Sequence, residues 1–125
     1  MSDHKRVVRA YMDAYARFDR ATIGALLTDD VRWDVPGAFH IQGRDAFDAH
    51  IVDPYSDGPP QITITRLTEE DGVVIAEGRV RAARTDGSVV RLEYCDVFEM
   101  RDGKIARLIS YLAPDDTAPS AGGGA

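Results

Sequence analysis

The chain has 125 residues, of which 44% are hydrophobic and 29% are charged, and these shares are typical of one folded globular domain rather than of a disordered chain. Asp and Glu outnumber Lys and Arg by 21 to 15, which gives a net charge of −6. The sequence has no Lys/Arg cluster that could follow a phosphate backbone, so we expect no nucleic-acid partner.

The first part of the chain is predicted to be helical. Apolar residues recur at three- and four-residue steps over residues 3–18, which is typical of an amphipathic helix with Tyr11 and Tyr15 on its apolar face. Asp19 then suits the N-cap of a second, short helix over residues 20–27. Both helices therefore offer an apolar face to the rest of the chain.

The next segments combine short strands with one helix. Residues 31–35 alternate apolar and polar side chains, as a half-buried strand does, and a shorter strand is expected at residues 40–42. Residues 44–52 place apolar side chains four apart, which predicts a third helix. Residues 53–60 are expected to form a loop.

The remainder of the chain is rich in strands, which are predicted over residues 61–68, 73–84, 88–100 and 104–112. Asp-Gly pairs separate these strands, and Asp-Gly is a strong hairpin signal because both central residues of a type I′ turn prefer positive φ. We therefore expect a four-stranded antiparallel meander. Helices followed by such a sheet indicate an α+β domain over residues 1–113, and residues 114–125 are expected to be a disordered tail.

One of these strands carries an acid on its apolar face. Over residues 88–100 the even positions are mostly apolar, and Asp96 lies among them between Tyr94 and Phe98. Because side chains alternate along a strand, Asp96 is predicted to point into the interior. A carboxyl in that position needs a reason, so Asp96 is a candidate site residue.

The turn before this strand decides which residues face Asp96. A two-residue turn would place three charged residues on its side of the sheet: Glu77 opposite Asp96, Arg79 opposite Tyr94, and Arg81 opposite Leu92. That face would line a partly polar cavity, and the small aliphatic residues of the other face would suit a dimer interface, unless a β-bulge reverses the two. Asp96 could equally pair with Arg79 or Arg81 as an ion pair without any chemistry.

Several classes of protein are excluded by the residue pattern. No apolar run approaches the roughly 20 residues of a membrane-spanning helix, and the N-terminus lacks the apolar core of a signal peptide, so we expect a cytoplasmic protein without a membrane partner. Cys95 is the only cysteine, which excludes an intramolecular disulfide. The three histidines lack metal-ligand spacing, and we expect neither a metal nor another cofactor.

Tyr11 and the segments LLTDDVRWDVPG, IQGRDAF and DVFEMRDGKIARLISY together resemble the nuclear transport factor two-like superfamily. This superfamily includes ketosteroid isomerase and the SnoaL-like polyketide cyclases, and the resemblance covers roughly residues 5–112. It implies a cone-shaped fold, in which a curved antiparallel sheet wraps round the helices and leaves a pocket at its wide end. It also implies a homodimer formed through the sheet.

The resemblance to the isomerase branch implies three catalytic residues, Tyr11, Asp34 and Asp96. A carboxylate at Asp34 would shuttle a proton next to a carbonyl, while Tyr11 and a neutral Asp96 would donate hydrogen bonds to the enolate oxygen. The limonene epoxide hydrolase branch is disfavoured, because Ser110-Tyr111 stands where that branch is expected to carry an Asp.

Two departures from the isomerase pattern bear on these roles. The Asp29-Asp30 pair and Asp34 are separated by one residue fewer than in the isomerase pattern. A one-residue slip sends a strand side chain to the other face of the sheet. Either Asp34 reaches the pocket, which is our working hypothesis, or Trp33 lines the pocket and Asp34 is solvated. A guanidinium near Asp96 would keep that acid ionised and unable to donate a hydrogen bond.

The resemblance and the strand pattern also predict residues that line the pocket without a catalytic role. They are Tyr15, Trp33, His50, Tyr55, Arg79, Arg81, Tyr94, Leu108, Ser110 and Leu112.

We therefore predict a cofactor-independent enzyme that performs acid/base chemistry on a small hydrophobic or carbonyl-containing substrate, as a steroid isomerase or a polyketide cyclase does. The alternative is a non-catalytic ligand-binding or dimeric interaction module of the same fold. The direction of Asp34 separates the two hypotheses, because the catalytic one needs two carboxyl groups inside the pocket and the binding one needs a single carboxyl group.

Overall fold

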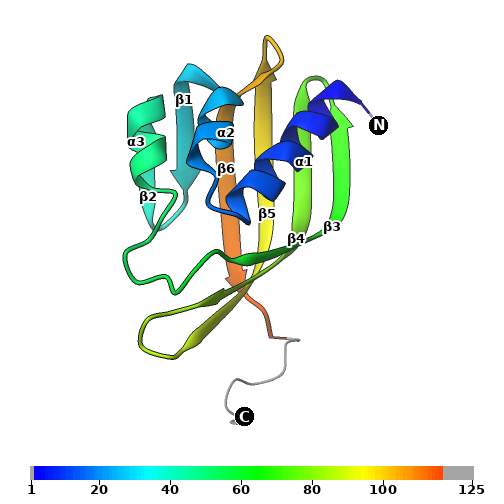
Figure 1. Cartoon of the computed structure of the whole chain (residues 1–125). Helices are drawn as coiled ribbons and strands as arrows, with labels where there is room; N and C mark the ends of the chain where they lie inside the picture. Colours follow the sequence, from blue (N-terminus) through cyan, green and yellow to red (C-terminus); the bar gives the residue numbers. More distant parts are fainter. Residues whose placement is uncertain (1, 117–125) are drawn as a thin grey trace.

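The structure is a computed structural model that describes residues 2–116, and it consists of three helices and six strands (Figure 1). In chain order the elements are α1 (Asp3–Tyr15), α2 (Arg20–Ala25), β1 (Leu27–Val35), β2 (Phe39–Gln42), α3 (Arg44–Ala49), β3 (Gln61–Glu70), β4 (Val73–Ala83), β5 (Val89–Arg101) and β6 (Lys104–Pro114).

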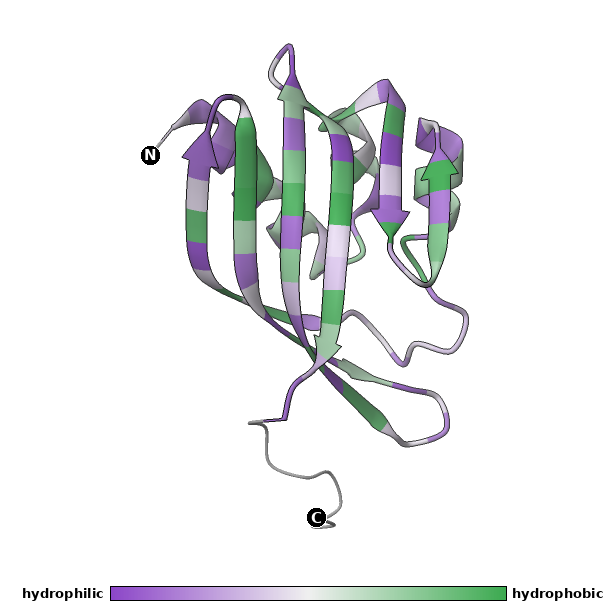
Figure 2. Ribbon diagram, turned by 180° about the vertical axis from the view of Figure 1, so that it is seen from behind, coloured by the Kyte–Doolittle hydropathy of each residue, from purple (hydrophilic) through white to green (hydrophobic). Residues whose placement is uncertain are grey.

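The six strands form a single curved sheet in the order β2-β1-β6-β5-β4-β3. All neighbours are antiparallel except β1 and β6, which are parallel. The helices cover one face of the sheet, and the view from behind shows the other face, where hydrophilic and hydrophobic residues alternate along the strands (Figures 1 and 2). The predicted α+β class and the meander from β3 to β6 are confirmed.

The helix α1 forms as its sequence pattern predicts and packs against β3, β4 and β6. The Ser2 side chain caps its N-terminus by accepting a hydrogen bond from the Lys5 amide. The apolar stripe buries Tyr11, which is 2% exposed. The helix ends three residues earlier than predicted, because Phe18 takes a φ of +53° that no α-helix accommodates.

A layer of apolar side chains fills the space between the helices and the sheet. Its fully buried members come from every part of the chain, and the largest are Phe47, Phe98, Ile23, Leu27, Ile105 and Leu108. None of the described helices is long and apolar enough to cross a membrane. The tail predicted to be disordered falls mainly on residues 117–125, which lie outside the described part of the chain.

The hairpin between β4 and β5 differs from the predicted two-residue turn. Ala83 pairs with Val89, and the Arg84 amide donates to the Ser88 carbonyl at 2.9 Å. Three residues therefore form the loop, and the last of them, Gly87, takes the left-handed conformation with a φ of +88°. The extra loop residue shifts the pairing of the whole hairpin by one position.

This shift corrects the predicted faces of the sheet. Ala76, not Glu77, lies opposite Asp96, and Arg79 and Arg81 lie opposite Glu93 and Arg91. The charged residues of β4 therefore point away from the helices. The small aliphatic residues that suggested a dimer interface lie on the covered face instead, where Val74 and Ala76 are fully buried.

Gly78 allows β3 and β4 to approach where their register shifts, between Ile64 and Arg66. A Cβ atom at this position would lie 1.8 Å from the Thr63 carbonyl oxygen, so no larger residue fits. The same carbonyl accepts a hydrogen bond of 3.0 Å from the Tyr94 hydroxyl, which crosses over the glycine. Gly78 therefore leaves the room that the Tyr94 hydroxyl needs to reach β3.

Candidate functional site

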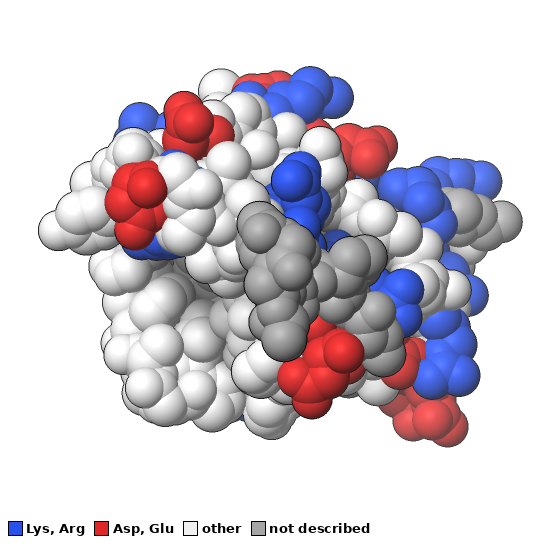
Figure 3. All heavy atoms as spheres, turned by 90° about the horizontal axis from the view of Figure 1, so that it is seen from below, with Lys and Arg blue, Asp and Glu red and all other residues white. Residues whose placement is uncertain are grey.

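A cavity of about 370 Å³ lies between the helical layer and the sheet, a size typical of small-molecule sites. It extends from the interior to the loop that follows α3, where His50 and Asp53 are exposed. The view from below shows charged side chains along the top and right of this end of the molecule and at its upper left, whereas uncharged residues cover its lower left (Figure 3).

Aromatic side chains form a large part of the cavity wall. Of the chain's ten aromatic residues (one Trp, five Tyr and four Phe), six line it: Tyr11, Tyr15, Phe18, Trp33, Phe39 and Tyr94. Neighbouring rings pack in tilted and edge-to-face arrangements, with centroids 5.8 Å apart for Tyr11 and Tyr15 and 5.2 Å apart for Trp33 and Phe39. Tyr11, Tyr15, Trp33 and Phe39 are therefore linked by ring contacts into one apolar surface of the cavity.

Asp96 brings an acid to this apolar surface. Its carboxyl is half-buried, and within residues 2–116 no Lys, Arg or His forms an ion pair with it. Burial raises the pKa of Asp96 to about 7, although a hydrogen bond from Ser110 acts in the opposite direction. Near neutral pH this carboxyl is therefore present in both its protonated and its ionised form.

A short chain of hydrogen bonds orients Asp96. The Trp33 ring nitrogen donates to the Ser110 hydroxyl oxygen at 3.1 Å, which leaves the hydroxyl hydrogen of Ser110 for the Asp96 carboxyl. Ser110 lies directly opposite Asp96 on β6. The three side chains come from three adjacent strands and hold the acid at a fixed place in the cavity wall.

The three tyrosines around Asp96 differ in their hydrogen bonds. Tyr15 donates to the Ile51 carbonyl at 3.1 Å, and Tyr94 donates to the Thr63 carbonyl at 3.0 Å. The Tyr11 hydroxyl has no hydrogen-bond partner among the described residues. Burial raises the pKa of Tyr11 well above its ordinary value and that of Tyr94 to about 12, so both stay neutral. Tyr11 is thus the phenol that can donate to a ligand.

His50 and Asp53 supply polar groups at the exposed end of the cavity. The Nδ1 of His50 lies 2.9 Å from the Ala46 carbonyl oxygen, and since a carbonyl can only accept, Nδ1 is the donor and Nε2 of the neutral ring carries the lone pair. Asp53 accepts a hydrogen bond from the Tyr55 amide, which lowers the pKa of Asp53, and it pairs with Arg84 at 3.2 Å.

Asp34 does not line this cavity, so the prediction that it faces the pocket is wrong. Trp33 points into the cavity, and alternation along β1 sends Asp34 to the opposite face of the sheet. It is not solvated there either, since it is only 3% exposed. Trp33 therefore lines the pocket, as one of the two alternatives predicted. Asp34 is buried on the outer face, which neither alternative predicted.

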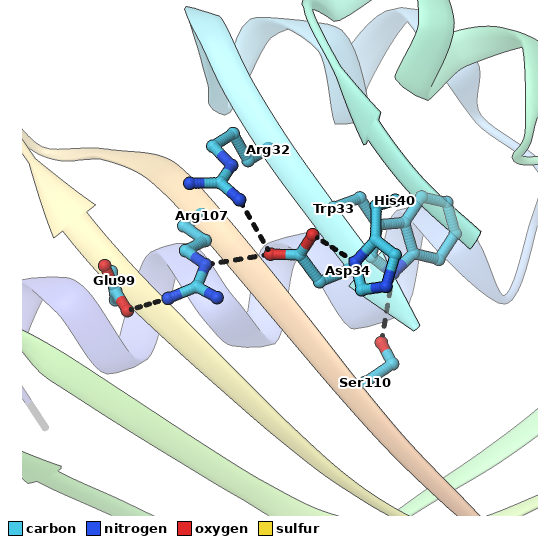
Figure 4. A network of polar contacts seen from close by, with 7 residues as sticks. All are labelled: Arg32, Trp33, Asp34, His40, Glu99, Arg107 and Ser110. Carbon is cyan, nitrogen blue, oxygen red and sulfur yellow. Dashed lines mark hydrogen bonds and ion pairs between the residues drawn. The ribbon is translucent and has the colours of Figure 1, made fainter. Parts of the chain in front are cut away.

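Three cationic or hydrogen-bonding side chains surround Asp34 (Figure 4). Its two carboxylate oxygens accept from His40 Nδ1 at 2.8 Å and from Arg107 Nε at 2.9 Å, and Arg32 lies 3.7 Å away. The hydrogen bond from His40, together with the two arginines, lowers the pKa of Asp34 against the effect of burial. Asp34 is therefore an ionised member of a polar network on the outer face at neutral pH.

Four further residues predicted to line the pocket do not do so. Arg79 and Arg81 lie on the outer face because of the hairpin register. Tyr55 is 64% exposed in the loop after α3, and Leu108 is buried in the core at 1% exposure. The cavity is lined by the other predicted residues, namely Tyr11, Tyr15, Trp33, His50, Tyr94, Asp96, Ser110 and Leu112.

Phe39, Asp53 and Ser56 also line the cavity, although the sequence pattern did not predict them there. Phe39 begins the short strand β2, where alternation gave a usable signal, but the loop residues Asp53 and Ser56 follow no periodic pattern. Within residues 2–116 no group of three or more His, Cys, Asp and Glu side chains is arranged to hold a metal ion.

A model of the SnoaL-like domain family matches residues 8–108. No curated protein matches the chain. Among solved structures, a protein from Xanthomonas campestris provisionally assigned as a polyketide cyclase is 26% identical, with a TM-score of 0.79, over 87% of this chain and 89% of that chain. An epoxide hydrolase of the limonene epoxide hydrolase-like type from Mycobacterium tuberculosis is 23% identical, with a TM-score of 0.79, over 89% and 83%.

A third structure, from Kribbella flavida, is provisionally assigned as a ketosteroid isomerase. It is 23% identical, with a TM-score of 0.76, and the match covers 95% of this chain and 84% of that chain. At these identities the two structures below 25% show a shared fold alone, and proteins with this fold carry several different activities.

Proposed function

The chain belongs to the SnoaL-like domain family, and from this premise we propose that it is a cofactor-independent enzyme that moves a proton on a small, largely apolar carbonyl compound. One observation carries the proposal: Asp96 places an acid with a pKa of about 7 in an aromatic cavity, without a cationic partner among the described residues. A group that titrates near the working pH is the best suited to both remove and return a proton.

The proposed reaction uses Asp96 as the only proton carrier. The ionised carboxylate removes a proton from the carbon next to the substrate carbonyl, and the electron pair moves to the carbonyl oxygen, which becomes an enolate. The Tyr11 hydroxyl, which has no partner among residues 2–116, donates a hydrogen bond to that oxygen. The protonated Asp96 then returns the proton, so the carboxyl is regenerated and no external acid or base is consumed.

Two outcomes share this first step. In an isomerisation, Asp96 returns the proton to another carbon of the enolate. In a cyclisation, the enolate carbon attacks a second carbonyl of the same molecule, and Asp96 returns the proton to the new alkoxide. The structure of the cavity supports both, since its walls are apolar and the acid lies at a single point.

The experiment tests the step common to both outcomes. Exchange of the protons next to the carbonyl of tetralone, an aromatic ketone, is measured by NMR in D₂O with the wild-type protein. Asp96→Asn is expected to slow the exchange by about 10²–10⁴-fold. The rate with the wild type should rise as the pH increases through about 7, because only the ionised carboxylate removes the proton.

Glu93→Gln is the matched control, because Glu93 lies three residues before Asp96 on the same strand and is exposed on the outer face. This variant should exchange the protons at the wild-type rate. Equal rates for the wild type and Asp96→Asn, or no exchange above the buffer rate with the wild type, would refute the proposal.

A non-catalytic ligand-binding module is the second candidate. It is favoured by the position of Asp34, since the carboxylate that the resemblance to the isomerase branch casts as the base lies outside the cavity. In that case tetralone would change the emission of Trp33, which lines the cavity, while its protons would exchange no faster than in buffer.

A further inference from the structure

The charges around the cavity are unbalanced. Asp53 and Asp96 line it, whereas none of the lining residues is Lys or Arg. Asp53 is paired with Arg84, but Asp96 has no ion pair with another described residue. Arg9 acts on the pKa of Tyr94 and is not among the groups that act on Asp96. The ionised form of Asp96 therefore lacks a counter-charge from the protein.

A carboxylate in apolar surroundings must obtain a positive charge, either from a proton or from a bound cation. The surroundings of Asp96 also attract cations, because the faces of Tyr and Trp rings carry negative potential and bind ammonium groups within about 6 Å. Tyr11, Tyr15 and Trp33 form such a wall, with centroids 5.8 Å and 6.3 Å apart. An anionic ligand would be repelled by the ionised form of Asp96.

We propose that the cavity binds an organic ammonium ion, which pairs with the carboxylate of Asp96 and contacts the rings of Tyr11, Tyr15 and Trp33. A weakly hydrated, alkylated ammonium fits best, since it loses little hydration on entering an apolar cavity. Such a ligand competes with the proton for Asp96. Binding of the ammonium ion needs no turnover, and a bound ammonium ion would inhibit the proposed reaction by occupying Asp96.

The groups that face Asp96 decide how this binding depends on pH. The helix α1 contributes Tyr11 and Tyr15, which stay neutral because burial raises the pKa of each. The strand β4 presents Ala76 and β6 presents Ser110, neither of which titrates. Tyr94 lies on β5 itself and is also neutral, with a pKa of about 12.

Two groups at the exposed end of the cavity complete the set. Asp53 stays ionised, because its hydrogen bonds lower its pKa. His50 also lines this end of the cavity and can carry a charge, so a test of Asp96 needs a control at this position.

The test compares two probes of the same shape. Benzyltrimethylammonium carries a permanent charge that does not titrate, and neopentylbenzene is its uncharged carbon analogue. The chain has one tryptophan, Trp33, and it lines the cavity, so Trp33 emission reports the binding of both. At about pH 8 the cation should bind at least about tenfold more tightly, a ratio that cation–π contacts and an ion pair in a desolvated site can supply.

The preference for the cation should decrease as the pH falls through about 7, where Asp96 becomes protonated. Asp96→Asn should lose the preference at all pH values while still binding neopentylbenzene, and Glu93→Gln should keep it. In His50→Gln the preference should still decrease as the pH falls through about 7, because Asp96 is unchanged. If Asp96→Asn does not fold, the pH series with the wild type and His50→Gln decides the matter.

The inference is overturned if neopentylbenzene binds as tightly as the cation at about pH 8, if neither probe binds, or if the preference is the same above and below the pKa of Asp96. Because these measurements need no turnover, they also separate this inference from the proposed reaction. Proton exchange that depends on Asp96, without any preference for the cation, would support the reaction and refute the ammonium site.

Discussion

Asp34 and Asp96 are two poorly exposed carboxyls that lie on opposite faces of the same sheet and have opposite electrostatic surroundings. Asp34, on β1, receives hydrogen bonds from His40 and Arg107 and has Arg32 close by, and its pKa is lowered. Asp96, on β5, faces aromatic rings and one hydroxyl, and its pKa is raised to about 7. Burial acts in the same direction on both, so the partners make the difference.

This difference indicates which acid can respond to a ligand. The charge of Asp34 is fixed by the arginines and the histidine that the protein itself supplies, and removing it would leave Arg107 with Glu99 alone as its ion-pair partner. Asp96 has no counter-charge from the protein, so a proton, a substrate or a bound cation can neutralise its carboxylate. A buried acid therefore marks a candidate site only when the protein leaves its charge uncompensated.

The largest effect on stability is expected from Asp96→Asn. The pKa of Asp96 is higher in the folded than in the unfolded state, so its ionisation lowers the free energy of unfolding. This loss is absent below about pH 4, grows as the pH rises toward 7, and is complete above that value. Since Asp96 is half-buried and the new amide carries its own burial cost, we expect the variant to be more stable than the wild type by about 3 kcal/mol at about pH 8.

Urea unfolding at about pH 4 and about pH 8 measures this difference. At the lower pH the two proteins should have nearly the same free energy of unfolding. A difference of the same size at both pH values would show that Asp96 is not protonated more readily in the folded protein, and the comparison with Asp34 would lose its basis.

Asp34→Asn should have the opposite sign and a smaller size. The lowered pKa of Asp34 means that its contribution is present above the unfolded pKa of about 4 and is lost as the pH falls through the lower, folded pKa. Removing one partner of a buried ion pair costs about 3–5 kcal/mol, and we expect about 2 kcal/mol because the His40 and Arg107 side chains are 68% and 34% exposed.

Asp29→Asn is the matched control for Asp34→Asn, because Asp29 lies on the same strand and pairs with Arg44 while its side chain is 94% exposed. Its loss should cost less than about 1 kcal/mol. If urea unfolding at about pH 7 gives equal losses for the two variants, the network around Asp34 contributes no more than a surface ion pair.

The direction of Asp96 followed from the sequence, whereas its neighbours did not. Alternation depends on one strand alone, and the run from Leu92 to Phe98 was sufficient to place Asp96 on the inner face. The cross-strand partners depend on the number of residues in the turn, and the Asp86-Gly87 pair is compatible with loops of two or three residues. One extra loop residue moved Arg79 and Arg81 to the other face.

Asp34 shows the opposite case. Its alternation with Trp33 indicated the outer face, but the resemblance to the isomerase branch placed it in the pocket, and the strand pattern was the better guide. Its partner Arg107 is 73 residues away in the sequence. The two meet because β1 and β6 pair in parallel, a contact that no local pattern encodes.

The smallest effects on stability are expected from two tyrosines of the cavity, Tyr94 and Tyr11. The Tyr94 hydroxyl is bonded within the protein and the Tyr11 hydroxyl is available to a ligand, just as Asp34 has partners in the protein and Asp96 has no counter-charge there. Tyr94→Phe should cost about 1 kcal/mol in urea unfolding, because it removes the hydrogen bond to the Thr63 carbonyl. Tyr11→Phe should leave stability unchanged, since this hydroxyl has no partner among residues 2–116. In the tetralone assay the order should reverse, with Tyr11→Phe slowing exchange by about 10–10²-fold and Tyr94→Phe having little effect. A loss of stability in Tyr11→Phe with unchanged exchange would mean that its hydroxyl serves the fold, and Asp96 would then be the only group that the cavity directs at a carbonyl.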